Sequence, residues 1–161
     1  MRPKLYFLIG VPAAGKSSWM AVQPFDWTRT VVVSSDRHID IYAINEGKTY
    51  NEVFNDYAPI AMKLMHDDVA SAVELGYDIV WDQTNTSVKA RATKLKAVPD
   101  TYEKIAVMFM TPDDAEHTRR LGERPDKKIP DSIMTRMKAQ LELPTDNEGF
   151  DKIIYVDNKT L

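Results

Sequence analysis

Five short apolar runs alternate with longer amphipathic stretches along the chain. The runs are rich in β-branched and aromatic residues, which is typical of strands buried on both faces of a parallel sheet. We expect strands over residues 5–9, 30–34, 77–81, 104–110 and 152–156. Apolar residues recur at helical spacing, or helix start and stop signals occur, over residues 16–22, 37–45, 50–75, 88–97, 112–122 and 130–143. This alternation predicts an α/β fold with a parallel five-stranded sheet and helices on both faces.

Three segments with candidate site residues follow the first three expected strands. They are Gly10–Ser17, Ser34–Asp36 and Asp82–Asn85. In a parallel α/β sheet, ligands collect at the carboxyl ends of the strands. We therefore expect the three segments to meet in one site.

The first segment, GVPAAGKS, fits the pattern G-x-x-x-x-G-K-[ST] between a strand and a helix. In that context the backbone N–H groups of the loop and the helix N-terminus surround phosphate oxygens. The alternative, a structural glycine turn with an incidental lysine, does not account for the full motif in its strand and helix context. The motif predicts a nucleoside triphosphate site in which Lys16 reaches the β- and γ-phosphates and Ser17 ligates Mg²⁺. The residues expected to hold the nucleotide are Gly10, Ala13, Ala14, Gly15, Lys16, Ser17 and Ser18.

Asp36 closes the second strand and opens the next helix. A carboxylate at this place can orient an acceptor hydroxyl, take its proton and contribute to the metal site. The alternative is that Ser35 or Asp36 only caps a helix. We favour the catalytic interpretation, and we expect Arg37 to contact the substrate.

Asp82 ends the third strand, as the acid of a Walker-B motif does. It could hold Mg²⁺ through water, fix a nearby arginine or bind the substrate. The alternative is a loop aspartate, with Thr84 and Asn85 in turn chemistry. The pattern leaves these alternatives open. If the segment binds the substrate, we expect Asp82, Thr84 and Asn85 to contact it.

Basic residues are concentrated between two expected helices. They are Arg119, Arg120, Arg124, Lys127 and Lys128. We interpret residues 112–130 as a small helical lid whose arginines neutralise the transferring phosphate, with Arg120 at the nucleotide. A solvated helix end is the alternative. A second basic stretch (Lys89, Arg91, Lys94 and Lys96) is more typical of a solvated helix face, although it could flank a polyanionic substrate.

Composition places few further limits on function. The 161 residues suit a single domain over 1–161, with 43% apolar and 28% charged residues. The net charge of −3 gives no global signal for nucleic acid, so such a surface must be local. No stretch approaches the roughly 20 apolar residues of a membrane span. We expect a cytoplasmic enzyme, and no protein partner can be inferred.

Taken together, these motifs resemble the 5′-kinase domains of bacteriophage polynucleotide kinases and the wider group of small P-loop kinases. The resemblance runs from Lys4 to about Asp157. It rests on Gly10–Ser17, Ser34–Asp36, Asp82–Asn85 and the Arg120…Arg124 pair. It implies ATP-dependent phosphorylation of a 5′-hydroxyl of DNA or RNA, in the cytoplasm of the host cell if the protein is phage-encoded. It also implies Asp36 as general base, Lys16 and Arg124 as transition-state cations, and Ser17 as a magnesium ligand.

Two positions depart from the family pattern. Ala13 stands where the family often has glycine, and Ile39 stands where it tends to have a phosphate-binding arginine. The second departure leaves a different acceptor open: a small-molecule or modified-base hydroxyl, as in nucleoside and nucleotide kinases. A third hypothesis, from another class, is a nucleotide-binding switch or ATPase module; Asp36 argues against it, because hydrolysis has no acceptor hydroxyl to deprotonate.

Overall fold

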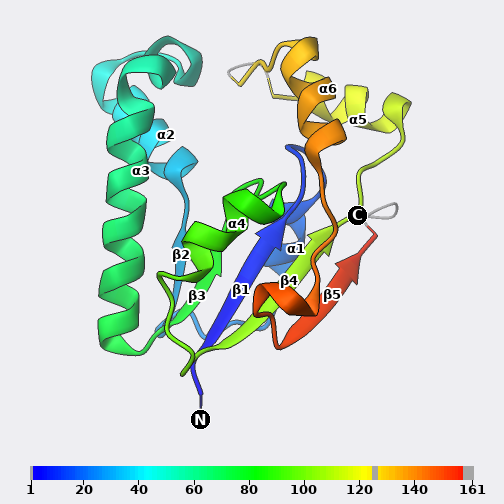
Figure 1. Ribbon diagram of the computed structural model, residues 1–161. Coiled ribbons are helices and arrows are strands. Elements are labelled where there is room, and N and C mark those ends of the chain that lie inside the picture. Colours follow the sequence, from blue (N-terminus) through cyan, green and yellow to red (C-terminus); the bar gives the residue numbers. More distant parts are fainter. Residues whose placement is uncertain (1, 125–126, 158–161) are drawn as a thin grey trace.

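A parallel five-stranded sheet forms the centre of the molecule (Figure 1). The computed structural model describes residues 2–124 and 127–157. The strands pair in the order β2-β3-β1-β4-β5, and every pairing is parallel. Their bounds are β1 Lys4–Ile9, β2 Thr30–Val33, β3 Asp78–Trp81, β4 Glu103–Phe109 and β5 Lys152–Val156.

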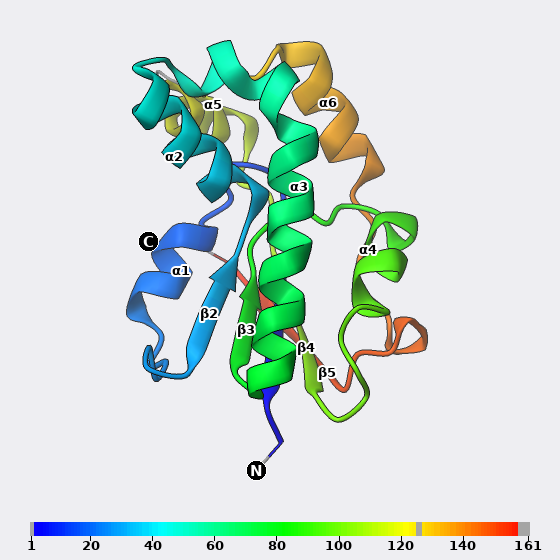
Figure 2. The same cartoon turned by 90° about the vertical axis from the view of Figure 1, so that its left-hand side faces the viewer.

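Helices cover both faces of this sheet, which confirms the predicted α/β architecture (Figures 1 and 2). Helices α3 and α4 pack on one face and α1 packs on the other. The bounds are α1 Lys16–Val22, α2 Ser35–Glu46, α3 Tyr50–Leu75, α4 Val88–Leu95, α5 Asp114–Gly122 and α6 Asp131–Gln140, with a 3₁₀ turn, η1, at Asp146–Glu148.

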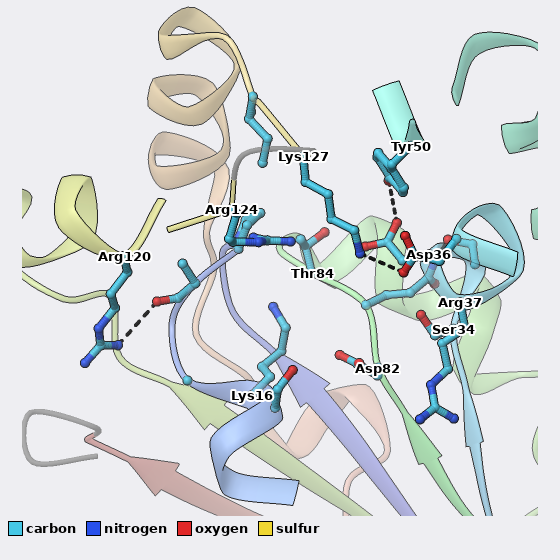
Figure 3. Close-up of a pocket in the computed structure, with 18 of the residues that line it drawn as sticks. Lys16, Ser34, Asp36, Arg37, Tyr50, Asp82, Thr84, Arg120, Arg124 and Lys127 are labelled. Atoms are coloured by element: carbon cyan, nitrogen blue, oxygen red, sulfur yellow. Dashed lines mark hydrogen bonds and ion pairs between the residues drawn. The ribbon is translucent and has the colours of Figure 1, made fainter. Parts of the chain in front are cut away.

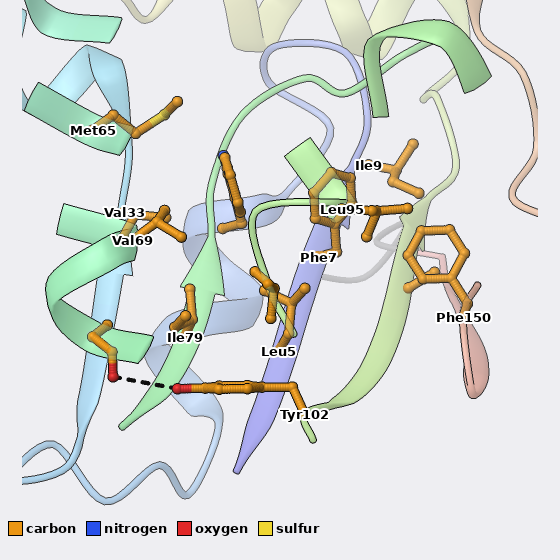
Figure 4. Packing of buried hydrophobic residues seen from close by; sticks show 14 of the residues in the cluster. Leu5, Phe7, Ile9, Val33, Met65, Val69, Ile79, Leu95, Tyr102 and Phe150 are labelled. Carbon is orange, nitrogen blue, oxygen red and sulfur yellow. Dashed lines mark hydrogen bonds between the residues drawn. The ribbon is translucent and has the colours of Figure 1, made fainter. Parts of the chain in front are cut away.

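Strand β1 is buried on both faces because its side chains alternate between two cores. Leu5, Phe7 and Ile9 pack under α3 and α4 (Figure 4), whereas Leu8 packs with Trp19 of α1. Each such side chain stabilises the fold by about 1.5–3 kcal/mol relative to an exposed one. This core holds the carboxyl end of β1, and hence the loop that follows it, in a fixed place.

Helices α2 and α3 form an antiparallel hairpin that projects beyond the carboxyl edge of the sheet (Figure 1). Gly47, with φ 66°, ends α2, and a capping box between Thr49 and Glu52 begins α3. The rings of Tyr42 and Tyr57 stack at 3.9 Å between centroids. The hairpin stands opposite α5 and α6, so two helical arms flank the strand ends (Figure 1).

Helix α6 ends three residues before the expected position 143. Glu142 N donates to Thr86 O at 2.7 Å, so the chain after Gln140 pairs with the loop that follows β3 instead of continuing the helix. The expected boundary was wrong because this partner lies more than fifty residues away in the sequence.

The basic stretch of α4 divides into three environments. Lys89 and Lys96 are exposed, as expected of a solvated face, and Lys94 is half-buried. Arg91 is fully buried: its guanidinium pairs with Glu148, with Nε 2.7 Å from Oε1, and donates to the carbonyl oxygens of Asn85 and Glu142. Arg91 thus fastens the connection from α6 to β5 onto α4.

Among the described residues, none of the helices is both long enough and apolar enough to cross a membrane.

Candidate active site

Two left-handed residues and one close backbone approach shape the loop between β1 and α1. Gly10 passes so close to β4 that an added Cβ would lie 3.0 Å from Phe109 Cβ, and its N–H donates to Thr84 O at 2.9 Å. Gly15, with φ 103°, is the N-cap of α1. Ala13 has φ 62°, a left-handed conformation that costs an L-residue about 1–2 kcal/mol. The loop therefore tolerates a Cβ at Ala13 at some cost in strain.

Lys16 opens α1 and lines a large cleft over the strand ends (Figure 3). Its Nζ donates to Gly10 O at 2.7 Å and Val11 O at 3.2 Å. Burial lowers the pKa of Lys16 to about 8; the charges of Asp82 and Asp36 oppose this shift, and Arg124 adds to it. Ser17 and Ser18 line the same cleft.

Asp36 lies in the first turn of α2 and also lines the cleft. The N-cap of α2 is Ser34, whose side chain makes no capping bond, while Ser35 Oγ accepts from Gln83 Nε2 at 2.9 Å. The Asp36 carboxylate instead accepts a 2.6 Å hydrogen bond from Tyr50 Oη of α3. Asp36 is therefore not occupied in capping its own helix.

Asp82 lies at the carboxyl end of β3, where its N–H donates to Val33 O. Burial raises the pKa of its carboxyl; the nearby Lys16 is the largest opposing cause. Figure 3 shows Lys16, Asp36 and Asp82 pointing into one cleft. The three candidate segments expected to meet at the strand ends thus do so.

Asn85 is the exception among the expected substrate contacts. Arg37 and Thr84 line the cleft together with Asp82, but Asn85 is 2% exposed and is not among the lining residues. Its Nδ2 donates to Leu8 O at 2.7 Å and its Oδ1 accepts from Lys94 at 2.6 Å. These bonds fasten the loop after β3 to β1, so the structure gives Asn85 a place in the support of the site.

The segment expected to form a lid carries α5 and part of the cleft wall. Arg120 donates to Ala13 O of the phosphate loop at 3.3 Å and pairs with Glu116. Arg119 and Arg124 both line the cleft, and the Arg119 guanidinium pairs with Glu116 and Glu123. Residues 125 and 126, inside the expected range 112–130, lie outside the described residues.

Residues 127 and 128, which follow these two positions, contact the α2–α3 hairpin. Lys127 Nζ lies 2.8 Å from Asp40 Oδ2 and 5.0 Å from the centroid of the Tyr50 ring (Figure 3). Lys128 O accepts from Asn51 Nδ2 at 3.0 Å. The segment between α5 and α6 therefore contacts the α2–α3 hairpin at residues that line the cleft.

Sequence reasoning missed His117, which is buried in α5. Its Nε2 lies 2.7 Å from Pro12 O, so the ring joins α5 to the phosphate loop. Burial lowers the pKa of His117, and among the described residues its Nδ1 is the one buried side-chain polar atom without a hydrogen bond. No motif marks this residue; only its contact with a loop 105 positions away does.

The cleft has a volume of about 1340 Å³, above the usual range of about 300–1,000 Å³ for a single small-ligand site. It therefore has room for a nucleotide and a second substrate. Within residues 2–124 and 127–157, no group of three or more His, Cys, Asp or Glu side chains could hold a metal. Magnesium needs no such cage in phosphoryl transfer, because one or two protein oxygens and the substrate phosphates suffice. Ser17, Asp36 and Asp82 supply oxygens of that kind.

This parallel sheet, loop and cleft define a P-loop kinase-like fold, which supports a phosphotransferase. Residues 5–144 match the family model described as AAA domain, and the chain belongs to that family.

Solved structures share the fold at low sequence identity. A Chloroflexus aurantiacus protein, provisionally described as a kinase, superposes with a TM-score of 0.74 at 15% identity, over 99% of this chain and 87% of that one. A chain of the Pnkp1/Rnl/Hen1 RNA repair complex gives 0.65 at 21% identity, and the match spans 86% of this chain but only 44% of that one. A gluconokinase from Sinorhizobium meliloti 1021 gives 0.58 at 17%, over 99% and 85%. These likenesses establish the fold and leave the acceptor open.

Proposed function

We propose that this protein is an ATP-dependent polynucleotide kinase that phosphorylates the 5′-hydroxyl of DNA or RNA. The observation that carries the proposal is that Lys16 and Asp36, from the starts of α1 and α2, line one cleft. Lys16 follows the candidate phosphate loop, and Asp36 offers a carboxylate with no capping role in its own helix. This arrangement suits transfer to a hydroxyl acceptor.

In this proposal the residues of the cleft divide the chemistry between them. The loop N–H groups and Lys16 hold the donor phosphates, and Arg120 and Arg124 neutralise charge on the transferring group. Asp36 takes the proton of the acceptor hydroxyl, whose oxygen bonds to the γ-phosphorus as ADP leaves. Bound ATP with Mg²⁺ supplies the phosphoryl group and further neutralises its charge. Ser17 and Asp36 offer oxygen ligands to the Mg²⁺ ion. Asp82 either holds Lys16 in place or binds a water molecule on the metal.

We propose that residues 1–161 act as one kinase domain and that residues 112–130 form its lid. The contact of Lys127 with Asp40 supports such a lid, because it links the basic segment to the opposite arm. The cytoplasm, of the host cell if the gene belongs to a phage, supplies both ATP and nucleic-acid ends.

A polyanionic acceptor is favoured by the charges around the cleft. Arg37, Lys127 and Lys128 line it on the Asp36 side, although the whole chain is acidic. A neutral nucleoside gains little from these cations. The acceptor preference should therefore depend on salt.

One observation favours a second candidate, a kinase of a small hydroxyl compound. Ile39 is 1% exposed in the core of the α2–α3 hairpin. This position therefore provides no positively charged side chain to bind a phosphate of the acceptor. The fold shared with a gluconokinase is compatible with such an acceptor. Arg37, two positions earlier, is the candidate that would replace the missing arginine.

Labelled ATP tests these functions directly. We expect a single-stranded 5′-hydroxyl oligonucleotide to be phosphorylated with a higher kcat/KM than a nucleoside or gluconate, and this advantage to shrink as salt rises. Arg37→Ala should reduce the advantage, whereas Lys89→Ala, on the exposed face of α4, is the matched control. Label on gluconate or nucleoside in preference to the oligonucleotide would establish the second candidate, and free phosphate alone would indicate an ATPase module.

A further inference from the structure

The first turns of α3 present a repeated pair of side chains to the cleft. Tyr50 and Phe54 are aromatic, Asn51 and Asn55 are amides, and all four line the cleft. Residues four apart lie on the same side of a helix. We call this set the α3 wall. Neither the motifs nor the proposed chemistry uses Phe54 or Asn55.

The α3 wall is held in place by the groups around it. The Thr49 capping box fixes the start of the helix. Tyr50 Oη is bonded to Asp36, and Asn51 Nδ2 is bonded to Lys128 O. The wall is therefore a preorganised surface beside the catalytic carboxylate.

Phe54 and Asn55 are the open part of this wall. Phe54 is 42% exposed, and its ring centroid lies 5.6 Å from that of Tyr50. The Asn55 side chain is exposed and has no hydrogen-bond partner within residues 2–124 and 127–157. An open aromatic face beside unused donors and acceptors matches a nucleobase, which has a stacking face and a hydrogen-bonding edge.

We propose that the α3 wall binds the base of the acceptor's terminal nucleotide, with Phe54 stacking on the base and Asn55 bonding to its edge. The inference rests on the proposed function and names a recognition site within it. The Tyr50 side chain spans the gap between the α3 backbone and Asp36. A nucleoside whose hydroxyl lies at Asp36 can extend along the same span and bring its base to the next turn of α3, about 5.4 Å along the helix.

Two consequences separate this site from the basic residues around the cleft. Stacking on a ring tolerates all four bases, so the enzyme should need a terminal base but discriminate little among bases. The stacking contribution should also persist at moderate salt, whereas contacts of Lys127 and Lys128 with phosphates should weaken. A sugar acid has no flat ring of this kind and would leave Phe54 unused.

The test compares two 5′-hydroxyl oligonucleotides that differ only in the presence of the terminal base, an abasic sugar replacing the terminal nucleoside in one. Wild-type protein should phosphorylate the intact oligonucleotide at least about fivefold more efficiently, given the usual contribution of one stacked base. Phe54→Ala should bring this ratio close to one, and Phe54→Trp should preserve it. Ile60→Ala, an exposed apolar position of α3 outside the cleft, is the control and should keep the wild-type ratio. Thermal unfolding checks that each variant is folded.

Binding of fluorescent versions of both oligonucleotides, with a non-hydrolysable ATP analogue present, separates this inference from the proposed function. In one outcome neither oligonucleotide is phosphorylated, but the wild type binds the base-bearing oligonucleotide more tightly and Phe54→Ala binds both equally. The proposed function then fails and the base site stands. Equal losses for both oligonucleotides in Phe54→Ala would make Phe54 a packing residue for the lid and overturn the base site. A wild type that ignores the terminal base in both assays would overturn it too.

Discussion

Tyr50 Oη donates a 2.6 Å hydrogen bond to Asp36 Oδ1, which ties the first turn of α3 to the first turn of α2. Burial raises the pKa of the Tyr50 phenol, and the bond to Asp36 raises it further, so the hydroxyl stays protonated and remains the donor. The bond occupies one carboxylate oxygen and leaves the other for an acceptor hydroxyl. The Tyr50 ring also lies under Lys127, so one side chain contacts both the carboxylate and the basic segment.

Tyr50→Phe should lower kcat without abolishing activity. The variant removes the bond that orients Asp36, and a misplaced catalytic group costs up to about 100-fold. Asp36→Asn removes the proposed proton acceptor and should cost more, within the 10²–10⁴-fold typical of a general base. Steady-state kinetics with saturating ATP measures both. Tyr57→Phe, which retains the ring stacked on Tyr42, is the control. If Tyr50→Phe lowers kcat no more than Tyr57→Phe does, the bond does not position Asp36.

The lowered pKa of Lys16 should make ATP affinity depend on pH. Its pKa of about 8 means that the ammonium is charged at pH 7 and mostly neutral at pH 9. ATP affinity should therefore fall roughly fivefold between pH 8 and pH 9, since the charged fraction drops from about one half at the pKa to about one tenth one pH unit above it. Lys16→Met should remove most phosphotransfer, leave the fold intact and abolish this pH dependence, as measured by calorimetric ATP titration and circular dichroism.

Lys94 provides a matched control for Lys16. It also lines the cleft, and burial lowers its pKa to about 8 as well. Lys94→Met should keep the fall in ATP affinity above pH 8. If the fall in ATP affinity above pH 8 disappears in Lys94→Met and persists in Lys16→Met, Lys94 causes it. This result would contradict the role of Lys16.

The sheet could be predicted because its strands carry a local signal. Each apolar run is short, uninterrupted and bounded by turn residues, and the polar residues that end these runs must share one edge of a parallel sheet. The convergence of Lys16, Asp36 and Asp82 follows from this topology alone. Their chemical roles stay predictions, because topology places groups without showing what they bind.

The missed features depend on partners far away in the sequence. Arg91 looks like part of a solvated face until Glu148, 57 positions away, pairs with it. Asn85 looks like a loop amide until Leu8 O accepts its bond. The α3 wall is different, since aromatic and amide pairs four residues apart at a capped helix start were readable in the sequence. The signal was present, but nothing in the sequence placed Phe54 at the cleft.

Arg124→Ala should lower kcat more than it weakens ATP binding. An arginine directed at the transferring phosphate acts chiefly in the transition state. The suitable control is Arg119→Ala, because Arg119 is on the same segment and also lines the cleft, but its guanidinium already pairs with Glu116 and Glu123. Lys127 is a poorer control, since its contact with Asp40 joins the two arms. Small, equal effects of Arg124→Ala and Arg119→Ala on kcat would mean that the segment is only a solvated patch.

His117 should make the fold sensitive to mild acid. Burial lowers its pKa below the ordinary 6.5. Lys138 and Arg120 lower the pKa further, while the bond to Pro12 and the nearby Asp114 oppose the shift. Above pH 6.5 the ring is neutral in both the folded and the unfolded chain. As the pH falls below 6.5, the unfolded chain takes up the proton first, so the free energy of unfolding should fall by at most about 1.4 kcal/mol per pH unit from this residue.

Urea unfolding of wild type and His117→Gln between pH 7.5 and pH 5 measures this contribution. Glutamine keeps an N–H donor for Pro12 O but does not titrate, so the variant should lose less stability with acid than the wild type. His66→Gln, which retains His117, should follow the wild-type slope. Nucleotide binding adds a second readout: protonation of His117 buries a charge and leaves its Nδ1–H without an acceptor among the described residues, which should disturb the packing of α5 against the loop that contains Pro12. ATP affinity of the folded wild type should therefore weaken toward pH 5 more than that of His117→Gln, and parallel curves for the two proteins in both measurements would show that His117 does not support the phosphate loop.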